Sequence, residues 1–578
     1  MVKRSMPRWL LAGSVAASAL AAATVSVSCS TSAPGGASTS SGATDTSSSA
    51  GNSGDVSSGF NPGDQGPFTD FPKDPIVEAG LPAGLPSLFA GAKGSDTGGP
   101  CLAEPAMDAM IPRNWTPLLF EWSPPAGQNV FELRLSVQGQ TNDLIVYTTK
   151  PTFTIDEAAW KALTVHSPGK DIQVTLRGAT LSGDKLTAGP ATGASGAVHI
   201  APTDAPGSVV YWTSSGGTSF QGFTIGDSKP VTVLTPATAG VASTGGQTSC
   251  ISCHTSSPDG KLVIYTRDVG TTSRAIDARR IDGKGAPDAE TISPSALALL
   301  GRNKQSAPVL STAHYSATDA VAVSSFLGGA LTANRYELAW VDLHAADDKG
   351  WGILARTGDP RQAASPAFRH DGTAIAYVSA ASVGEGVVSN VSDTDKTMDI
   401  YTVPYNDRKG GDAKPLPGAS DPAYREYYPI YSPGDTLLAF NRTDQPVDSY
   451  NQPSAELAVV PASGGTAVRL RANDPPACTG KKSPGLTNSW ARWAPSAVTV
   501  DGRKYYWLVF SSKRRDASAD GKGALLPQLY VSAIVTTVTA TGETIEKEYP
   551  ALYVTSQIPT ENNHTPAWDV FEVSNAPK

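Results

Sequence analysis

The chain has 578 residues, a formal net charge of −8, and only 17% charged residues. It contains 56 glycines and 45 prolines, which is typical of many short strands and turns and excludes a coiled coil or helical bundle rich in Glu, Lys and Leu. The acidic balance also argues against nucleic acid as a partner, because nucleic acid requires a basic face. We therefore expect an all-β fold.

The N-terminus predicts an exported protein. Three basic residues within the first eight precede an apolar stretch over residues 10–27, which is the pattern of a bacterial secretory signal. The end of this stretch resembles a lipobox, in which Cys29 is lipidated after cleavage, although Ser26 stands where that pattern has Leu, Val or Ile. Ordinary cleavage, for example after Ala23, is the alternative. We expect a signal over residues 1–28 and a membrane-anchored lipoprotein that faces the periplasm or the cell surface.

Residues 29–99 predict a tether rather than a folded unit. Ser, Thr, Gly, Ala and Asp make up almost all of residues 30–59, and such a segment cannot bury enough apolar surface to offset its ordering entropy. Proline-rich residues follow as an irregular lead-in. A lipid anchor in front of a folded body needs a spacer of this kind, and beyond the signal no apolar run approaches the ~20 residues of a membrane-spanning helix.

Residues 100–205 predict a small β unit. Apolar and polar residues alternate over 131–137 and 172–177, which indicates half-buried strands, and 144–148 is a third strand candidate. A short helix is expected between them, and Trp115 and Trp122 are candidates for the core. The size and pattern are similar to fibronectin type III and immunoglobulin-like β-sandwiches.

A recurring block organises residues 207–578. Its clearest copies read HTSSPDG from His254, PAFRHDG from Pro366 and PIYSPGD from Pro429, each followed by an apolar strand. Weaker copies begin near residues 312 and 491, so five copies follow one another at intervals of about 60 residues, which is typical of propeller blades with loop insertions.

These blocks resemble the P-x-W-S-P-D-G repeat of TolB-like and WD40-like β-propellers. The resemblance implies a six-bladed propeller over residues 207–578. Its sixth blade would combine the C-terminal residues 566–573 with strands at 209–212 and 220–234, which closes the ring. The expected fold is thus a β-sandwich followed by a six-bladed propeller.

Chemistry is suggested by one motif, Cys250-Ile251-Ser252-Cys253-His254, which matches the C-x-x-C-H signature of haem c attachment. The two thiols would form thioethers with one haem, and His254 would ligate its iron. A Cys250–Cys253 disulfide in an oxidising compartment is the main alternative, and another metal such as zinc is a third.

This motif running directly into a propeller block resembles a group of secreted bacterial propellers with a haem-type motif, including, distantly, the propeller domain of the hydrazine synthase alpha subunit. That enzyme carries further haem motifs, so its activity is not implied here. His564 and His314 are the candidates for a distal iron ligand, and a polar loop role is the alternative for His564. Tyr427, Tyr428 and Trp490 are candidates for lining a pocket at the channel mouth.

Cys101 and Cys478 form an even pair in an exported chain. We expect a disulfide that ties the sandwich to the propeller, with two buried thiols as the alternative.

Two functions follow from these patterns. The first is a redox protein with one haem c that exchanges electrons with a protein partner at the propeller face. The second is a cofactor-free, TolB-like module that binds a protein or glycan, with the membrane reached only through the lipid. The chain has no G-x-S-x-G or H-E-x-x-H motif, so nothing in it points to a hydrolase.

Overall fold

The structure is a computed structural model. It describes residues 70–215, 217–241, 250–269, 273–282, 284–303, 307–327, 335–381, 398–445, 449–515, 525–540, 542–571 and 573. The expected signal peptide, most of the expected tether and Cys29 lie outside these residues. Strands dominate the described elements, which confirms the all-β class. Within these ranges, no helix combines the length and the apolar character needed to cross a membrane.

The N-terminal unit is built from two sheets and two helices. The larger sheet has the order β1-β6-β5-β8-β9-β3, and the smaller has the order β2-β4-β7. Their bounds are β1 (Ile76–Val77), β2 (Cys101–Glu104), β3 (Met110–Ile111), β4 (Leu119–Ser123), β5 (Val130–Val137), β6 (Leu144–Thr148), β7 (Thr152–Thr154), β8 (Asp171–Ser182), β9 (Lys185–Ile200), α1 (Leu85–Gly91) and α2 (Glu157–His166).

The three strands expected from alternation, β5, β6 and β8, are confirmed and lie side by side. The two sheets share one apolar core, in which the rings of Trp122 and Phe131 meet edge to face at 5.6 Å. Trp115 also lies in this core, and its carbonyl accepts the indole N–H of Trp160 on α2. The side chain of Asp156 caps α2 by accepting the N–H groups of the helix's second and third residues.

The described strands from residue 208 onward form six antiparallel sheets, mostly consecutive meanders. The sheets are β10 (Ser208–Thr213), β11 (Ser219–Thr224) and β12 (Val231–Leu234) with β36 (Asn563–Asp569); β13 (Ile251–Ser256), β14 (Leu262–Val269) and β15 (Ser273–Arg280); β16 (Val309–Tyr315), β17 (Ala320–Leu327), β18 (Tyr336–Asp342) and β19 (Trp351–Ile353); β21 (Gln362–Phe368), β22 (Ala374–Ala380), β23 (Asp399–Pro404) and β25 (Lys414–Pro415); β26 (Arg425–Tyr431), β27 (Leu437–Thr443), β28 (Glu456–Pro461) and β29 (Val468–Arg469); and β30 (Ser489–Trp493), β31 (Val498–Val500), β32 (Arg503–Ser512), β33 (Gln528–Thr539), β34 (Gly542–Glu548) and β35 (Leu552–Tyr553).

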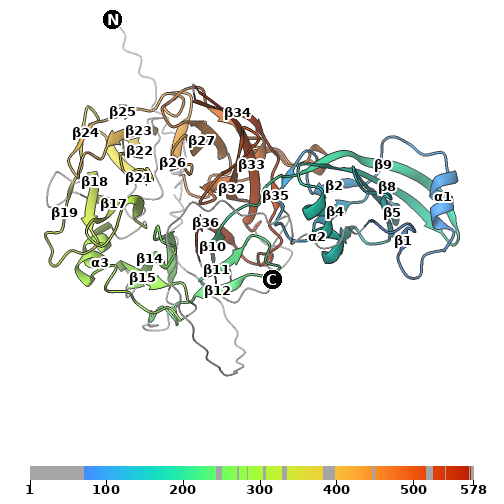
Figure 1. Ribbon diagram of the computed structural model, residues 1–578, viewed down its shortest axis with the longest axis horizontal. Coiled ribbons are helices and arrows are strands. Elements are labelled where there is room, and N and C mark those ends of the chain that lie inside the picture. Colours follow the sequence, from blue (N-terminus) through green and yellow to red (C-terminus); the bar gives the residue numbers. More distant parts are fainter. Residues whose placement is uncertain are drawn as a thin grey trace, which may run out of the picture.

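These sheets are disposed around a common centre, as Figure 1 shows, and the arrangement is that of a β-propeller. A short parallel pairing of β20 (Ala355–Thr357) with β24 (Gly410–Asp412) adds to the rim, and α3 (Pro294–Leu300) packs near β15 and β18. The C-terminal strand β36 pairs with β10, as expected, so both ends of the propeller segment lie in one sheet. This pairing removes a free sheet edge.

The repeated block encodes the turn between the first two strands of a sheet. In the first copy, Ser257 donates its hydroxyl to Asp259 and accepts the N–H of Leu262, while Gly260 adopts a φ of +69°. A Cβ at Gly260 would lie 2.5 Å from the carbonyl oxygen of Val570, so only glycine fits there.

A disulfide between Cys101 and Cys478 joins the N-terminal unit to the propeller, which confirms the expected pairing. Beside it, Asp108 accepts hydrogen bonds from His199 of its own unit and from Arg471 and Lys547 of the propeller. The apolar core of the N-terminal unit also continues into residues of β32 and β33.

Candidate functional site at the propeller centre

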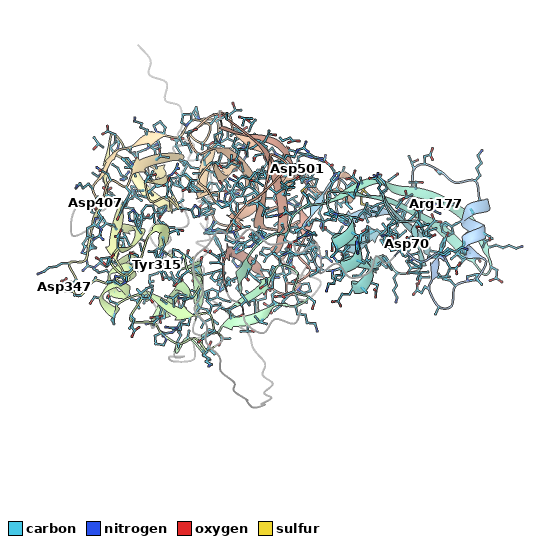
Figure 2. All side chains as sticks on the ribbon, in the orientation of Figure 1. Asp70, Arg177, Tyr315, Asp347, Asp407 and Asp501 are labelled. Carbon is cyan, nitrogen blue, oxygen red and sulfur yellow. A yellow bond between two sulfur atoms is a disulfide. The ribbon has the colours of Figure 1, made fainter. Side chains whose placement is uncertain are left out.

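One pocket lies where the six sheets meet. The innermost strand of every sheet, or the residue directly before it, contributes to its lining, and the contributors include His254, Val309, Pro366, Pro429, Arg492 and Thr565. The pocket encloses about 660 Å³ of space not filled by atoms, part of which is open to solvent. In Figure 2, the labelled residues Asp347 and Asp407 lie at the outer rim of the propeller, away from its centre.

Bulges in the innermost strands shape this pocket. The strand register shifts next to the pocket in β21, β26, β30 and β36. At each shift one residue takes a left-handed conformation: Ser365 (φ 44°), Tyr428 (φ 54°), Trp490 (φ 59°) and Thr565 (φ 47°). All four line the pocket, because a bulge re-aims the side chain of the extra residue.

Aromatic rings and a cation form one wall. The rings of Tyr428 and Trp490 stack with centroids 4.2 Å apart and an interplanar angle of 19°. The guanidinium of Arg492 lies over the Trp490 ring, 5.5 Å from its centroid. Burial lowers the pKa of Arg492 to about 10, so its side chain remains charged at neutral pH.

His254 lies beside this wall in β13. Its Nε2 is 3.1 Å from the carbonyl oxygen of Val210, so this nitrogen carries the proton and donates, and its ring packs on Phe220 at 4.5 Å. Its Nδ1 is buried and has no partner among the described residues. Burial lowers the pKa of His254 to about 4, which keeps the ring neutral at pH 7.

His564 is a neighbour of His254 through the adjacent strands β36 and β13, but it does not belong to the pocket lining. Its ring packs on Trp212 at 4.5 Å, and its nitrogens lie 3.4 Å from the Ser214 hydroxyl and 3.3 Å from the Tyr450 hydroxyl. Burial lowers the pKa of His564 to about 3. The structure thus brings His254 and His564 near each other, but both ring nitrogens of His564 already contact hydroxyl groups.

His314 is not brought to this site. Although it belongs to β16, its Nδ1 lies 2.7 Å from Asp319 and its Nε2 lies 3.2 Å from the carbonyl oxygen of Gly372, at the turn end of the strand. The expectation that it approaches His254 is therefore wrong. Of the three aromatic candidates, Tyr428 and Trp490 line the pocket, whereas Tyr427 is fully buried in the core.

The C-x-x-C-H motif lies at the start of an innermost strand. Residues 251–254 belong to β13 itself. Cys250 is buried in an apolar cluster between two sheets, whereas Cys253 lines the pocket. The alternative of a Cys250–Cys253 disulfide is not formed in the structure. The buried Cys250 is not part of the pocket that Cys253 lines, and the His254 Nε2 already donates to a carbonyl. As placed, these three residues do not fit a haem attached through both thiols.

Elsewhere in the described ranges, no group of three or more His, Cys, Asp or Glu side chains is suited to hold a metal ion.

Sequence reasoning missed three pocket residues, Arg492, Ser365 and Thr565. Ser365 and Thr565 each precede the proline of a block, as Tyr428 does, and this shared position was the available signal. Arg492 stands in the weakest copy, where no comparable pattern marks it.

No protein-family model and no curated protein sequence matches the chain. Among solved structures it is similar to one described as TolB from Agrobacterium tumefaciens, at 13% identity over 62% of this chain and 97% of that chain, with a TM-score of 0.32. It is also similar to the periplasmic gluconolactonase of Pseudomonas aeruginosa, at 13% identity over 62% and 99% of the two chains, with a TM-score of 0.28. A third is the β-propeller domain of the Trilobed protease of Pyrococcus furiosus, at 10% identity over 52% and 98%, with a TM-score of 0.25.

The sheet topology itself defines the class of protein. The chain is an all-β protein in which a β-propeller with a pocket at its centre is joined covalently to an N-terminal β unit.

Proposed function

We propose that this chain is an exported, lipid-anchored binding protein, in which a six-bladed propeller captures a ligand in its central pocket without a resident cofactor. The N-terminal unit serves as a β-sandwich of the fibronectin or immunoglobulin-like kind. A disulfide between the two units suits an oxidising compartment outside the cytoplasm. The anchored body would face the periplasm or the cell surface.

One observation carries this proposal: all six innermost strands supply residues to a single pocket, and its wall combines stacked aromatic rings with a charged guanidinium. Concave sites with apolar walls and a few convergent polar groups are the usual form of a small-molecule site. The redox function with haem c at Cys250, Cys253 and His254 stays a prediction of the sequence, and the burial of Cys250 in an apolar cluster outside the pocket favours the cofactor-free alternative.

The first test separates these two functions. The full chain is produced in a bacterium that matures c-type cytochromes, next to Cys253→Ser and a known cytochrome c as a positive control. We expect no covalent haem stain and no pyridine haemochrome band in either form of this protein. A stain in the wild type that Cys253→Ser abolishes would overturn the proposal, and peptide mapping without reductant shows whether the Cys250 and Cys253 sulfurs carry a haem.

The second test concerns binding itself. Thermal unfolding of the full chain is measured with benzoate, benzylamine and glucose, which differ in charge. We expect at least one of them to raise the Tm of the wild type and to lose this effect in Tyr428→Ala, because Tyr428 supports the aromatic wall. Equal shifts in the wild type and the variant would place the binding elsewhere and contradict a role for this pocket.

A further inference from the structure

The pocket contains a cation that the protein does not neutralise. Arg492 is half-buried in β30, and its Nη1 donates to the carbonyl of Ala491 at 2.8 Å. No carboxylate among the described residues forms an ion pair with it, and the neighbouring groups whose charge bears on it are Tyr428 and His254. Neither of these is an anion at neutral pH.

Two more deeply buried arginines of the propeller, Arg356 and Arg514, have partners for their charged N–H groups. Arg356 pairs with Glu337 and Asp359. Arg514 forms no ion pair with a described carboxylate, but its Nε donates to Ser512 and its Nη2 donates to the carbonyl of Ala472 and to Asn488. The Nε and Nη2 of Arg492 have no such acceptor among the described residues. A charge without a counterion at a half-buried site loses part of its solvation, so the open Nε and Nη2 of this arginine favour an acceptor that a ligand brings.

The open edge has the shape of a fork. Because Nη1 is occupied by the Ala491 carbonyl, Nε–H and Nη2–H remain, and these two bonds point in the same direction on a planar guanidinium. The Trp490 ring against its face fixes the plane of the group. Two parallel N–H donors match the two oxygens of a carboxylate, and such bidentate pairs are among the strongest hydrogen bonds in proteins.

The rest of the wall limits the ligand further. Pro308, Val309, Pro366 and Pro429 present apolar surface to the same pocket. Among the described lining residues Arg492 alone carries a permanent positive charge, so a phosphate dianion would leave a second negative charge without a partner in apolar surroundings. From this arrangement we infer that the pocket binds a small organic monocarboxylate, with its carboxylate on the Nε/Nη2 edge of Arg492 and its apolar body against the prolines. This inference rests on the proposed function and names the ligand class.

The test uses three probes of similar shape on the full chain at pH 7. Isothermal titration compares benzoate with benzamide, which lacks the charge, and with phenyl phosphate, which carries up to two charges. We expect benzoate to bind about tenfold or more tightly than benzamide, since a hydrogen bond to a charged group is worth more than a neutral one, and more tightly than phenyl phosphate, whose second negative charge would lack a partner. Absence of benzoate binding, or equal binding of benzamide, would overturn the inference.

Variants then localise the effect. Arg492→Gln should weaken benzoate binding roughly 10- to 100-fold, and Arg492→Lys, which keeps the charge but loses the fork, should weaken it less. Arg503→Gln is the matched control, because Arg503 is exposed and paired with Glu546 on the propeller surface, and it should bind benzoate as the wild type does. If Arg492→Gln does not fold, the test rests on the benzoate affinity of Arg492→Lys. An affinity equal to that of the wild type would contradict the bidentate contact through Nε and Nη2.

Failure of the carboxylate class is distinguishable from failure of the proposed function. Binding of benzamide or phenyl phosphate that Tyr428→Ala removes, without tighter binding of benzoate, overturns the ligand class and leaves the binding pocket in place. Covalent haem together with no binding of any probe overturns both.

Discussion

Glu426 shows what burial does to a single side chain. It lies in β26 with 0% exposure; one carboxyl oxygen accepts the N–H of Asp421 at 3.0 Å, and the other has no partner among the described residues. Burial, reinforced by the negative charges of Asp399 and Asp421, raises the pKa of Glu426 to about 8. The native protein therefore holds a proton on Glu426 between pH 4.5 and 8, where the unfolded chain releases it.

This difference predicts a pH dependence of stability. Because the native state binds more protons than the unfolded state in this range, the contribution of Glu426 to the free energy of unfolding is full below pH 4.5 and is lost as the pH rises through 8. Glu426→Gln removes the titration. From pH 4.5 to 8, denaturant unfolding should show the variant gaining about 3–5 kcal/mol relative to the wild type.

The exposed Glu290 supplies the control, since Glu290→Gln should follow the wild-type pH profile. Parallel profiles for Glu426→Gln and the wild type would contradict the assignment of a neutral carboxyl at this position.

Among the elements, the innermost strands carry the site because each departs from regular pairing. Non-glycine residues in the left-handed region are strained by about 1 kcal/mol or more, and four of these strands place one such residue at the pocket.

The symmetry of the innermost strands around the axis explains what the sequence could predict. Position in the repeat identified His254, Tyr428 and Trp490, because equivalent positions in a propeller face the same axis.

The remaining lining could not be predicted from the sequence for a physical reason. Side chains alternate between the two faces of a strand, so a bulge of one residue decides which neighbour points inward. Tyr427 and Tyr428 are adjacent, and only the bulge separates a core residue from a pocket residue. The mistaken position of His314 has a related cause, because it lies in the irregular stretch of β16 between Leu310 and Tyr315, where its ring contacts Asp319 and the carbonyl of Gly372.

The strain predicts an effect of glycine at one bulge. Ser365 has a φ of 44° and a hydroxyl without a partner in the described structure, so Ser365→Gly should raise the free energy of unfolding by about 0.5–1 kcal/mol. Ser379 is the matched control: its hydroxyl is also buried without a described partner, but it lies in regular β22. Ser379→Gly should lower stability by about 0.5–1 kcal/mol. A loss of stability in both variants, measured in denaturant, would argue against strain at the bulge.

Over the whole molecule, the two units are joined by three kinds of contact. The disulfide is covalent, Asp108 links His199 to Arg471 and Lys547, and a common apolar core runs between them. Burial raises the pKa of Asp108, but the hydrogen bonds from Lys547, Arg471 and His199 outweigh it and hold the pKa well below its usual range. The N-terminal unit is thus fixed to one side of the propeller (Figure 1) and leaves the axial pocket independent of it.

The disulfide predicts a property of the whole chain. It closes a loop between residues 377 positions apart, so replacing Cys101 and Cys478 together by serine should lower the free energy of unfolding by about 2–5 kcal/mol. Because the Asp108 cluster and the shared core remain, we expect the two units to stay associated, with an unchanged small-angle scattering profile under native conditions. Unfolding at the same denaturant concentration as the wild type would show that the crosslink adds no stability.

The most direct test of the account is a crystal structure of the mature protein grown with benzoate. We predict six blades around the axis, benzoate in the central pocket with its carboxylate within hydrogen-bond distance of the Nε and Nη2 of Arg492, and no haem at Cys250 and Cys253. An empty pocket with benzoate bound elsewhere, or a haem joined to both cysteines, would contradict the account.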